Sequence, residues 1–409
     1  MKGKVLIHSI AFNPDGVSTG YLYSDIATAL RDAGHEVIVL TTTPHFNRVE
    51  AQLKKQPLKW KLWGFLKKSN YKGITVYHVP QKKFKSTALR LVGFVYWHIV
   101  SFISALFIKN VDVILSPSPP LTIGLINIWL GKLKGAKVIY NVQEVYPDIL
   151  GKDSGMVFSA LSKMERHIYN NSAAITTIDE IFHSTIVGRF KDPSKLHIIP
   201  NFVDTEIYRP ISDTSHLDKS LFIENDHLKL LYAGNIGMAQ EWETLIEVAK
   251  RTKRKPIDYY VIGEGVMHDY VAAKIKEFDL ANVHLLPYQP RELMPEIIAF
   301  SDIQYIFMEP KIAAQGFPSK VYTIMASAKP LLVCSPDNTP IVNFLKDIDC
   351  AKIITAADVK SKADEICLWL DSVTPEQLHS MGRKGLAEIE NKYSKDIVTT
   401  QYCDLISQL

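Results

Sequence analysis

The chain has 409 residues, a formal net charge of +4 and 47% hydrophobic residues. This length is sufficient for two domains of ordinary size, and the composition is that of a globular protein and excludes a disordered one. The cysteines are Cys334, Cys350, Cys367 and Cys403. Because no pair lies two residues apart, they argue against a zinc site or a dithiol redox centre and fit a reducing cytoplasm.

A strand, a helix and a second strand are predicted at residues 4–9, 21–33 and 37–40, from their apolar runs and helical periodicity. Such a βαβ unit requires a parallel sheet with a right-handed crossover. The first apolar run is followed too soon by the segment Asn13-Pro14-Asp15-Gly16 to be a signal peptide, so we interpret it as a strand.

The loop after this first strand is a candidate binding site. It lies at the carboxyl end of the predicted sheet, where open α/β folds bind their ligands. Its small and hydroxyl-bearing residues are Gly16, Ser18, Thr19 and Gly20. The alternative interpretation is an ordinary connecting loop.

Residues 51–111 contain no aspartate or glutamate. Lysines and arginines are concentrated between residues 54 and 90, where Trp60, Trp63, Phe65 and Phe84 interleave with them. An anionic bilayer attracts such a mixture, each basic residue contributing about 1 kcal/mol near the membrane. We therefore expect the stretch 54–90 to bind an anionic membrane surface and not nucleic acid, for which no motif is present. A solvated basic face is the alternative.

Residues 91–108 form an apolar run of about the minimum length for a transmembrane helix, with only His98 ionisable. The strands predicted on either side, at 37–40 and 113–116, need the same sheet, and a spanning helix would separate them. We therefore expect a buried or membrane-grazing helix in which His98 is packed.

Helices and strands continue to alternate in the first half of the chain. Further strands are predicted at 111–116, 137–141 and 173–178, with helices at 121–133 and 156–170. The strand at 137–141 is followed by the polar segment Gln143-Glu144-Val145-Tyr146-Pro147-Asp148, again at the carboxyl end of a strand.

A second βα series follows a polar stretch that ends at His227, and we place the domain boundary before this stretch, after residue 205. Its strands are predicted at 228–232, 258–262, 283–286, 303–307 and 331–334. The segment 263–265 (GEG) is not a dinucleotide fingerprint, because His268 occupies the position of the third glycine.

The segment Gly316-Phe317-Pro318-Ser319-Lys320 predicts a loop that enters a helix. We expect Pro318 at the first helical position and Ser319 and Lys320 in the first turn, where free N–H groups and the helix dipole attract an anion. A lysine there opposes the dipole, and a bound phosphate would remove that conflict. The alternative is that Lys320 points into water.

These segments together resemble glycosyltransferase family 4. The similar blocks are Gly34–Leu40 (GHEVIVL), Ile199–Thr205 (IPNFVDT), Tyr232–Gly237 (YAGNIG), Val261–Gly265 (VIGEG) and the helix that begins at Pro318-Ser319-Lys320. Gln143–Pro147 (QEVYP) is similar to a block of the bacterial polysaccharide and O-antigen subgroup. The resemblance implies the α/β GT-B fold, in which two doubly wound, Rossmann-like parallel-sheet domains face each other across a cleft. We expect an acceptor-binding domain at 1–205, joined by a helix at about 393–409, and a nucleotide-sugar-binding domain at 206–392.

The resemblance also implies roles for single residues. Lys320 would bind the donor diphosphate with backbone N–H groups of Phe317, Ser319 and, across the cleft, Gly16. The two glutamates by which the wider family binds the donor sugar and ribose are replaced by Gln315 and Thr323, and its two phosphate-binding cations by Asn235 and Gln240.

Other donor contacts are expected at the ends of the second-domain strands, namely at Gly237, Gly263, Glu264, Gly265, Tyr288, Gln289, Gly316 and Pro318. Gln143 stands where the family has a histidine that contacts the donor sugar. Glu144 would orient the acceptor or sugar hydroxyls, or cap a local turn. Ser18 and Thr19 are the expected acceptor contacts. Lys320, Glu144 and Gln143 are thus the expected catalytic residues.

The implied activity is transfer of a hexosyl or N-acetylhexosaminyl group from a nucleoside-diphosphate sugar, expected to be UDP-linked, with retention of configuration. The expected acceptor is a lipid-linked saccharide or polysaccharide at the inner face of the cytoplasmic membrane, and no metal or other cofactor is expected. A nucleotide-sugar-binding subunit without transfer activity is the alternative. A sugar-nucleotide epimerase is less favoured, because we find no acid and base side chains for it.

Overall fold

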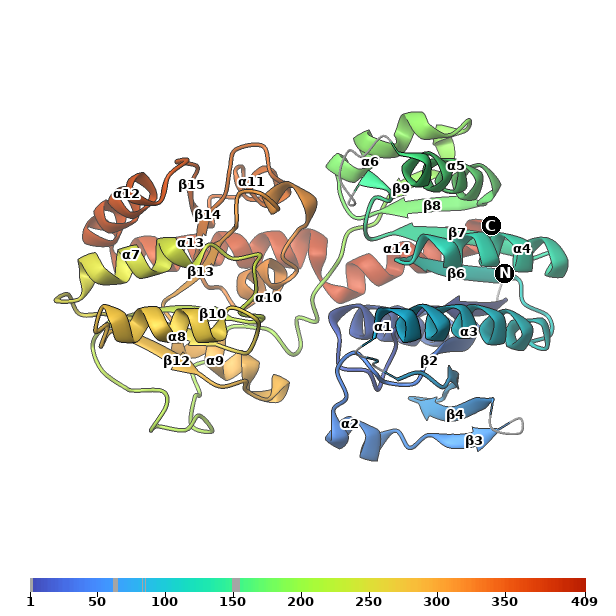
Figure 1. Ribbon diagram of the computed structural model, residues 1–409, viewed down its shortest axis with the longest axis horizontal. Helices are drawn as coiled ribbons and strands as arrows, with labels where there is room; N and C mark the ends of the chain where they lie inside the picture. Colours follow the sequence, from blue (N-terminus) through green and yellow to red (C-terminus); the bar gives the residue numbers. More distant parts are fainter. Residues whose placement is uncertain (1–2, 62–64, 83, 85, 149–154) are drawn as a thin grey trace. The chain divides into compact units, whose positions relative to one another are not determined.

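The computed structural model describes residues 3–61, 65–82, 84, 86–148 and 155–409. Trp63 of the predicted basic–aromatic stretch therefore lies outside the described residues. The chain forms two compact units, residues 1–201 with 395–409, and residues 202–394 (Figure 1). The division falls between Asn201 and Phe202, whereas the sequence placed it after residue 205.

The first unit is built on a nine-stranded sheet of order β3-β4-β5-β2-β1-β6-β7-β8-β9. Its strands are β1 (Lys4–His8), β2 (Glu36–Thr42), β3 (Lys59–Lys61), β4 (Leu66–Tyr71), β5 (Ile74–Val79), β6 (Val113–Ser118), β7 (Lys137–Val142), β8 (Ala174–Thr177) and β9 (Leu196–Ile198). Among the described strands of this sheet, β4 alone pairs antiparallel, with its neighbours β3 and β5. The basic stretch therefore contains an antiparallel edge that the sequence analysis did not predict.

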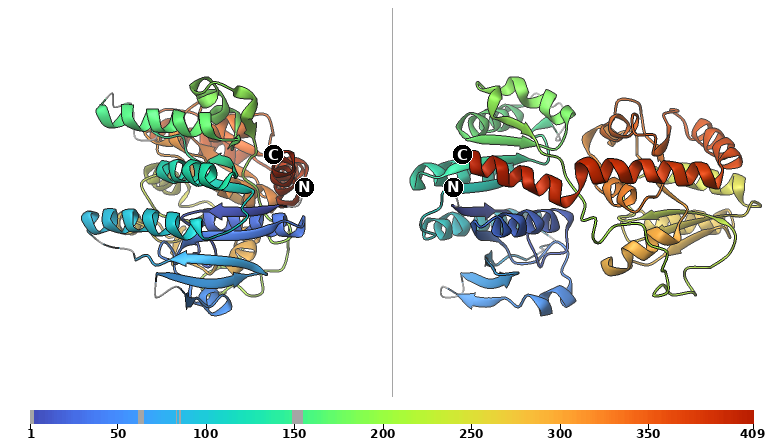
Figure 2. Two further views of the ribbon diagram at one scale, coloured as in Figure 1. Left: turned by 90° about the vertical axis from the view of Figure 1, so that its right-hand side faces the viewer. Right: turned by 180° about the vertical axis from the view of Figure 1, so that it is seen from behind.

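The helices of the first unit are α1 (Ser18–Asp32), α2 (Glu50–Lys55), α3 (Thr87–Leu106), α4 (Leu121–Lys134), α5 (Met156–Asn171), α6 (Glu180–Ile186) and α14 (Lys395–Gln408). Helices α3, α4 and α5 cover one face of the sheet (Figure 2), and α14 packs beside α1. Because helices cover the sheet, strands such as β1 and β6 are buried along most of their length and contain the apolar runs 5–7 and 113–115.

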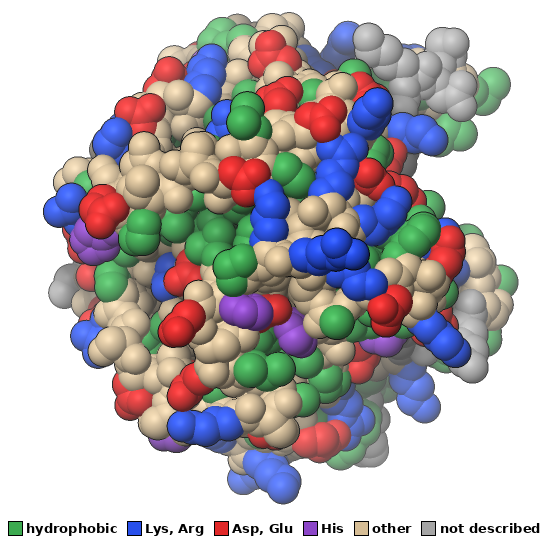
Figure 3. All heavy atoms as spheres, turned by 90° about the vertical axis from the view of Figure 1, so that its left-hand side faces the viewer, with side chains coloured by type: hydrophobic (Ala, Val, Ile, Leu, Met, Phe, Trp, Pro, Cys, Tyr) green, Lys and Arg blue, Asp and Glu red, His purple; other side chains and the backbone are tan. Residues whose placement is uncertain are grey.

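The second unit has a six-stranded, fully parallel sheet of order β12-β11-β10-β13-β14-β15. Its strands are β10 (Leu228–Ala233), β11 (Ile257–Ile262), β12 (Val283–Leu286), β13 (Ile303–Phe307), β14 (Leu331–Cys334) and β15 (Ala351–Ile354). Its helices are α7 (Trp242–Thr252), α8 (His268–Glu277), α9 (Met294–Phe300), α10 (Lys320–Ala326), α11 (Pro340–Leu345), α12 (Val359–Ser372) and α13 (Pro375–Glu388). On the face of this unit drawn in Figure 3, cationic and anionic side chains are intermixed. The predicted pair of doubly wound parallel-sheet domains is confirmed.

Of the two alternatives expected for helix α3, a buried or a membrane-grazing helix, the structure contradicts the fully buried one. Trp97, His98, Ser101 and Ala105 face the unit interior, but 22% of its most apolar window is buried. By length and composition alone this helix could cross a membrane. His98 is packed as expected, with Nδ1 2.7 Å from the Phe94 carbonyl oxygen and Nε2 2.8 Å from the Thr122 hydroxyl. The helix is thus held on the sheet by one face while the other remains exposed.

Candidate active site

The loop after β1 is fastened to the loop after β2. The Asp15 carboxylate accepts hydrogen bonds from the backbone N–H groups of His45 (3.0 Å) and Asn47 (2.7 Å). The Gly16 N–H donates to the Asn47 carbonyl oxygen at 2.8 Å. The expected role of the Gly16 N–H as a diphosphate donor therefore conflicts with the structure, because a backbone carbonyl already accepts from this group. A Cβ at Gly16 would lie 2.8 Å from Val49 Cγ2, so the glycine is needed for the close approach of the two loops.

Ser18 and Thr19 form the first turn of α1, which starts at the carboxyl end of β1. Ser18 is exposed and Thr19 is half-buried, so the Ser18 hydroxyl is open to a ligand. Gly20 packs its backbone against this loop, since a Cβ there would lie 2.9 Å from the Asp15 carbonyl oxygen.

Gln143, directly beyond β7, belongs to a hydrogen-bonded network inside the first unit. Its Nε2 donates to Asn141 Oδ1 at 2.9 Å, and its Oε1 accepts from Asn201 Nδ2 at 2.9 Å. Asn141 in turn donates to Thr176 on β8 and to the Tyr402 hydroxyl on α14. Tyr23 on α1 donates its hydroxyl to Asn141 Oδ1. The Gln143 amide is therefore held in one orientation by several elements, including the C-terminal helix.

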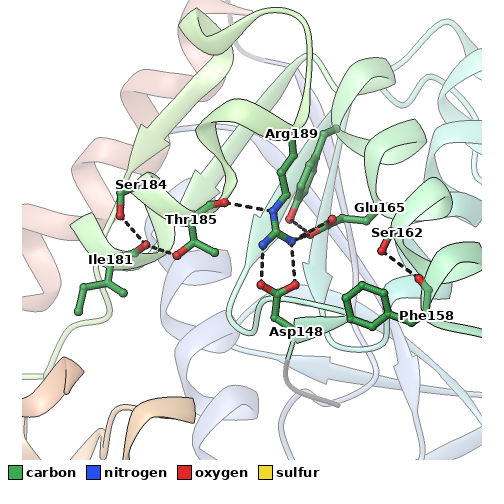
Figure 4. Close-up of polar contacts among 9 residues, drawn as sticks. Asp148, Phe158, Ser162, Glu165, Ile181, Ser184, Thr185 and Arg189 are labelled. Carbon is green, nitrogen blue, oxygen red and sulfur yellow. Dashed lines mark hydrogen bonds and ion pairs between the residues drawn. The ribbon is translucent and has the colours of Figure 1, made fainter. Parts of the chain in front are cut away.

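The segment that contains Glu144 is also fastened at its far end. The Arg189 guanidinium binds Asp148 through both terminal nitrogens and Glu165 Oε1 at 3.0 Å (Figure 4). Glu165 is buried and accepts a further hydrogen bond from the Tyr169 hydroxyl at 2.9 Å. Partial burial raises the pKa of Glu144 above its ordinary value. This half-buried carboxyl group thus lies on a loop that is held at both ends.

In the second unit, the loops after β10 and β11 interlock through their glycines. Gly263 has φ +140°, and a Cβ there would lie 1.9 Å from the Gly234 carbonyl oxygen. A Cβ at Gly265 would lie 2.2 Å from the Ile236 carbonyl oxygen. The Ile236 N–H also donates to the Glu264 carbonyl oxygen at 2.9 Å. These glycines are needed because two backbones meet where side chains would otherwise stand.

Lys320 reaches the same strand ends from α10. Its Nζ donates to the Ala233 carbonyl oxygen at 2.9 Å and lies 3.6 Å from the centroid of the Tyr232 ring. A Cβ at Gly234 would lie 2.6 Å from this Nζ. The alternative in which Lys320 points into water is therefore wrong. Among the described residues no carboxylate pairs with the ammonium group, and burial lowers its pKa to about 7. A buried cation without a counter-charge is suited to an anionic ligand.

The start of α10 differs from the prediction. The helix begins at Lys320, so Pro318 and Ser319 precede it instead of forming its first turn. The Phe317 side chain packs against Tyr322 and Phe344, with ring centroids 5.4 and 5.1 Å away. Gly316 connects this segment to the short helical turn at 313–315, and the Gln315 side chain lies outside the described part of the chain. The predicted anion site therefore depends on the Lys320 ammonium group and not on a helix N-terminus.

The other predicted donor residues differ in how firmly they are held. The Thr323 hydroxyl donates to the Lys320 carbonyl oxygen at 2.8 Å and remains able to accept a hydrogen bond. Asn235 is exposed beside Gly237, and Gln240 Nε2 donates to the Ala239 carbonyl oxygen at 3.2 Å. Tyr288 is exposed in the turn after β12. Neighbouring Gln289 donates to the Pro287 carbonyl oxygen at 3.1 Å.

Sequence reasoning missed the residues that hold these groups in place. Asn141, Tyr402 and Arg189 carry no local motif, because their partners are far away in the chain. Tyr232 was identified only as part of a block, although its ring contacts the Lys320 ammonium group. The described residues contain no group of three or more His, Cys, Asp or Glu side chains that could hold a metal ion.

Two family models match consecutive parts of the chain. The model of Glycosyltransferase Family 4 matches residues 20–207, and the model of Glycosyl transferases group 1 matches residues 213–387. Together they match most of each unit of the fold.

Curated relatives and solved structures agree with these matches. The chain is 23% identical to the putative colanic acid biosynthesis glycosyl transferase WcaI of Escherichia coli, over 79% of this chain and 81% of that protein. It is 23% identical to the probable glycosyltransferase WbjE of Pseudomonas aeruginosa, over 73% of this chain and 75% of that protein. The sucrose-phosphate synthase of Thermosynechococcus elongatus superposes with a TM-score of 0.75 at 12% identity, over 100% and 99% of the two chains. HepE of Anabaena, solved in complex with UDP, superposes with a TM-score of 0.72 at 13% identity, over 100% of both chains.

Proposed function

The chain belongs to glycosyltransferase family 4, and we propose that it transfers a sugar from a UDP-sugar to a lipid-linked acceptor, with retention of configuration, during synthesis of a cell-surface polysaccharide. The name of WcaI refers to colanic acid biosynthesis, which supports a polysaccharide product. The complexes of HepE with UDP and with UDP-glucose support a uridine nucleotide as donor.

The observation that carries this proposal is the buried ammonium group of Lys320 at the end of β10. When the bond between the sugar and the diphosphate breaks, negative charge develops on the leaving phosphate. A cation already in place stabilises that charge more in the transition state than in the ground state. The exposed Gly234 and Asn235 next to it leave room for a diphosphate to approach.

The proposed reaction needs no paired carboxylates and no metal. The bond from the anomeric carbon to the phosphate oxygen breaks, and the acceptor oxygen bonds to the same face of that carbon. The acceptor proton passes to the departing phosphate. In this scheme the fixed Gln143 amide contacts the transferred sugar, and Glu144 orients the acceptor or sugar hydroxyls. The glycine loop at 263–265 and the side chains of Tyr288 and Gln289 surround the base.

We place the reaction at the inner face of the cytoplasmic membrane. The described part of the stretch 54–90 presents exposed lysines such as Lys59 and Lys61 beside exposed Trp60 and Phe65. Cationic and aromatic side chains together favour an anionic lipid surface.

The test is transfer from labelled UDP-, GDP- and ADP-sugars to a bacterial lipid extract. We expect one UDP-sugar to be consumed, and Lys320→Met to reduce turnover by about 10²- to 10³-fold, as for loss of one charge-stabilising donor. Lys329→Met is the matched control, because the Lys329 ammonium also donates to backbone carbonyl oxygens, at 2.8 and 2.5 Å, on another side of the unit. Equal turnover of the two variants would overturn the role of Lys320. Nucleotide binding without transfer to any acceptor would favour the binding subunit instead.

A further inference from the structure

The first unit contains a cavity of about 850 Å³ that none of the expected donor or acceptor residues lines. It lies between α2, the β3–β4 pair, the segment after β5 and the first three turns of α3. Its volume is within the range of pockets that hold small organic ligands. Apolar side chains dominate its wall, among them Leu53, Leu58, Trp60, Leu89 and Val92. Three of these are strongly exposed, with Trp60 at 58%, Leu89 at 50% and Val92 at 64%.

Cationic groups border this apolar wall. Lys67 and Lys82 both line the cavity, and the Lys67 ammonium lies 4.4 Å from the centroid of the Trp60 ring. The other lining charges are Arg48 and Glu50, which pair with each other at 2.8 Å and so cancel. Two lysines are therefore left to attract an anion to the edge of an apolar pocket.

The cavity continues into the exposed face of α3. Large apolar side chains with exposed fractions of 40% or more recur along that face at Leu89, Leu91, Val92, Val95, Ile99, Ile103 and Leu106. Leu89 and Val92 belong to both the face and the cavity. Trp129 and Leu133 of α4 are exposed as well, and α4 lies beside α3 on the same side of the sheet (Figure 2). A contiguous exposed apolar surface of this kind marks an interaction site.

We propose that the cavity binds a phosphate-bearing lipid, with the phosphate at Lys67 and Lys82 and the first part of the apolar chain against Trp60, Leu89 and Val92. The remaining chain then follows the exposed face of α3 into the bilayer. This assignment rests on the proposed function, because the lipid is the carrier of the acceptor. An amphiphile with one anionic end fits a pocket with cations on its border and apolar walls that lead to an apolar helix face.

The position of the cavity in the fold agrees with an acceptor site. Thr43, Pro44 and Gln81, which also line it, follow the carboxyl ends of β2 and β5. The loop after β2 is the one that Asp15 fastens to the loop of Gly16 and Ser18. A lipid phosphate held there lies at the same end of the sheet as the expected acceptor contacts.

The experiment measures binding of farnesyl phosphate, farnesol and inorganic phosphate to the full chain by equilibrium dialysis. We expect farnesyl phosphate to bind at least tenfold more tightly than farnesol, and inorganic phosphate to bind weakly. Val92→Asp should reduce farnesyl phosphate affinity at least tenfold, and the double variant Lys67→Ala with Lys82→Ala should bring it to the level of farnesol. Leu368→Asp, at a residue of the second unit that is 72% exposed, controls for the added charge and should leave all three affinities unchanged.

The variant Ile103→Asp distinguishes contact of α3 with a bilayer from lipid binding in the cavity. Ile103 is 49% exposed on the same helix face but does not line the cavity. This variant should weaken binding to vesicles of phosphatidylcholine with phosphatidylglycerol and leave farnesyl phosphate affinity within twofold. The proposal would be overturned if Val92→Asp and Ile103→Asp lost farnesyl phosphate affinity equally. It would also be overturned if the wild-type chain bound farnesyl phosphate and farnesol with equal affinity.

The experiments distinguish an error in the lipid-pocket proposal from an error in the proposed transferase function. If the wild-type chain transfers sugar to lipid extract and Val92→Asp does so with unchanged acceptor KM, the pocket assignment is wrong and the transferase remains. If farnesyl phosphate binds as expected but no sugar is transferred to any acceptor, the pocket stands and the proposed function fails. UDP binding, measured in every variant, should remain unchanged, which shows that the second unit is intact.

Discussion

Nucleotide binding should be coupled to protonation of Lys320. Burial lowers the pKa of this ammonium group to about 7, and no carboxylate among the described residues pairs with it. A diphosphate beside it would favour the charged form and raise the pKa again. Binding above pH 7 must therefore take up a proton. Lys320→Met removes the titrating group and keeps a long apolar side chain.

The size of the effect follows from the fraction of free protein that is charged. At pH 8, one unit above a pKa of about 7, roughly one tenth of the free molecules carry the proton at Lys320. If the protonated form binds UDP, the apparent UDP affinity at pH 8 is about tenfold lower than that of the fully protonated protein. It falls by about another tenfold for each further pH unit, up to the pKa of Lys320 in the UDP complex. The sign is definite: affinity decreases as pH rises.

The assay is calorimetric titration of the wild-type chain with UDP between pH 7 and 9, in two buffers that differ in ionisation enthalpy. We expect uptake of about 0.9 proton at pH 8, the neutral fraction of Lys320. Lys320→Met should bind more weakly and show no uptake, whereas Lys329→Met should retain the wild-type slope. A flat wild-type affinity over this range, or the same slope in Lys320→Met, would refute the coupling. The range begins at pH 7 because the nucleotide's terminal phosphate titrates near pH 6.

Three further predictions concern the framework of the site. Gly263→Ala places a Cβ against the Gly234 carbonyl oxygen at φ +140°, so it should lower the free energy of thermal unfolding by about 1–3 kcal/mol and abolish UDP binding. Gly188→Ala is the control and should be neutral, because a Cβ at Gly188 meets nothing within 4 Å. Wild-type UDP affinity in Gly263→Ala would contradict the interlocked loops. Arg189→Met leaves the buried Glu165 carboxylate without its ion pair and should lower the free energy of unfolding in urea by about 3 kcal/mol at pH 7. This loss of stability should shrink at low pH, because Glu165 is then protonated and uncharged. An equal loss of stability at low pH would show that the unpaired carboxylate is not the cause. Treatment with EDTA should leave sugar transfer unchanged, and loss of activity that Mg²⁺ or Mn²⁺ restores would show that the metal-free scheme is wrong.

Much of the architecture was accessible from local sequence patterns. Apolar runs such as 228–232 and 303–307, separated by helical periodicity, indicate buried parallel strands, because such strands are covered on both faces. Glycines directly after these strands, such as Gly234 and Gly263, indicate loops where backbones approach closely. Buried strands and close-approach glycines depend on neighbours within a few residues, so the amino-acid sequence alone reveals them.

Directions of side chains and long-range partners were decided only by the tertiary structure. The sequence indicated a lysine near a phosphate site, but the packing of Tyr232 and the Ala233 carbonyl determines that its ammonium group turns inward. The Gly16 N–H was a plausible ligand donor until the loop after β2 was found to accept from it. The apolar composition of α3 suggested a buried or membrane-grazing helix, and because a sheet can cover only one side of a helix, the other apolar side remains exposed. The sequence by itself therefore determined the fold class and the strand ends that carry the candidate site, whereas the orientation of its side chains and the cavity beside α3 come from contacts between segments far apart in the chain.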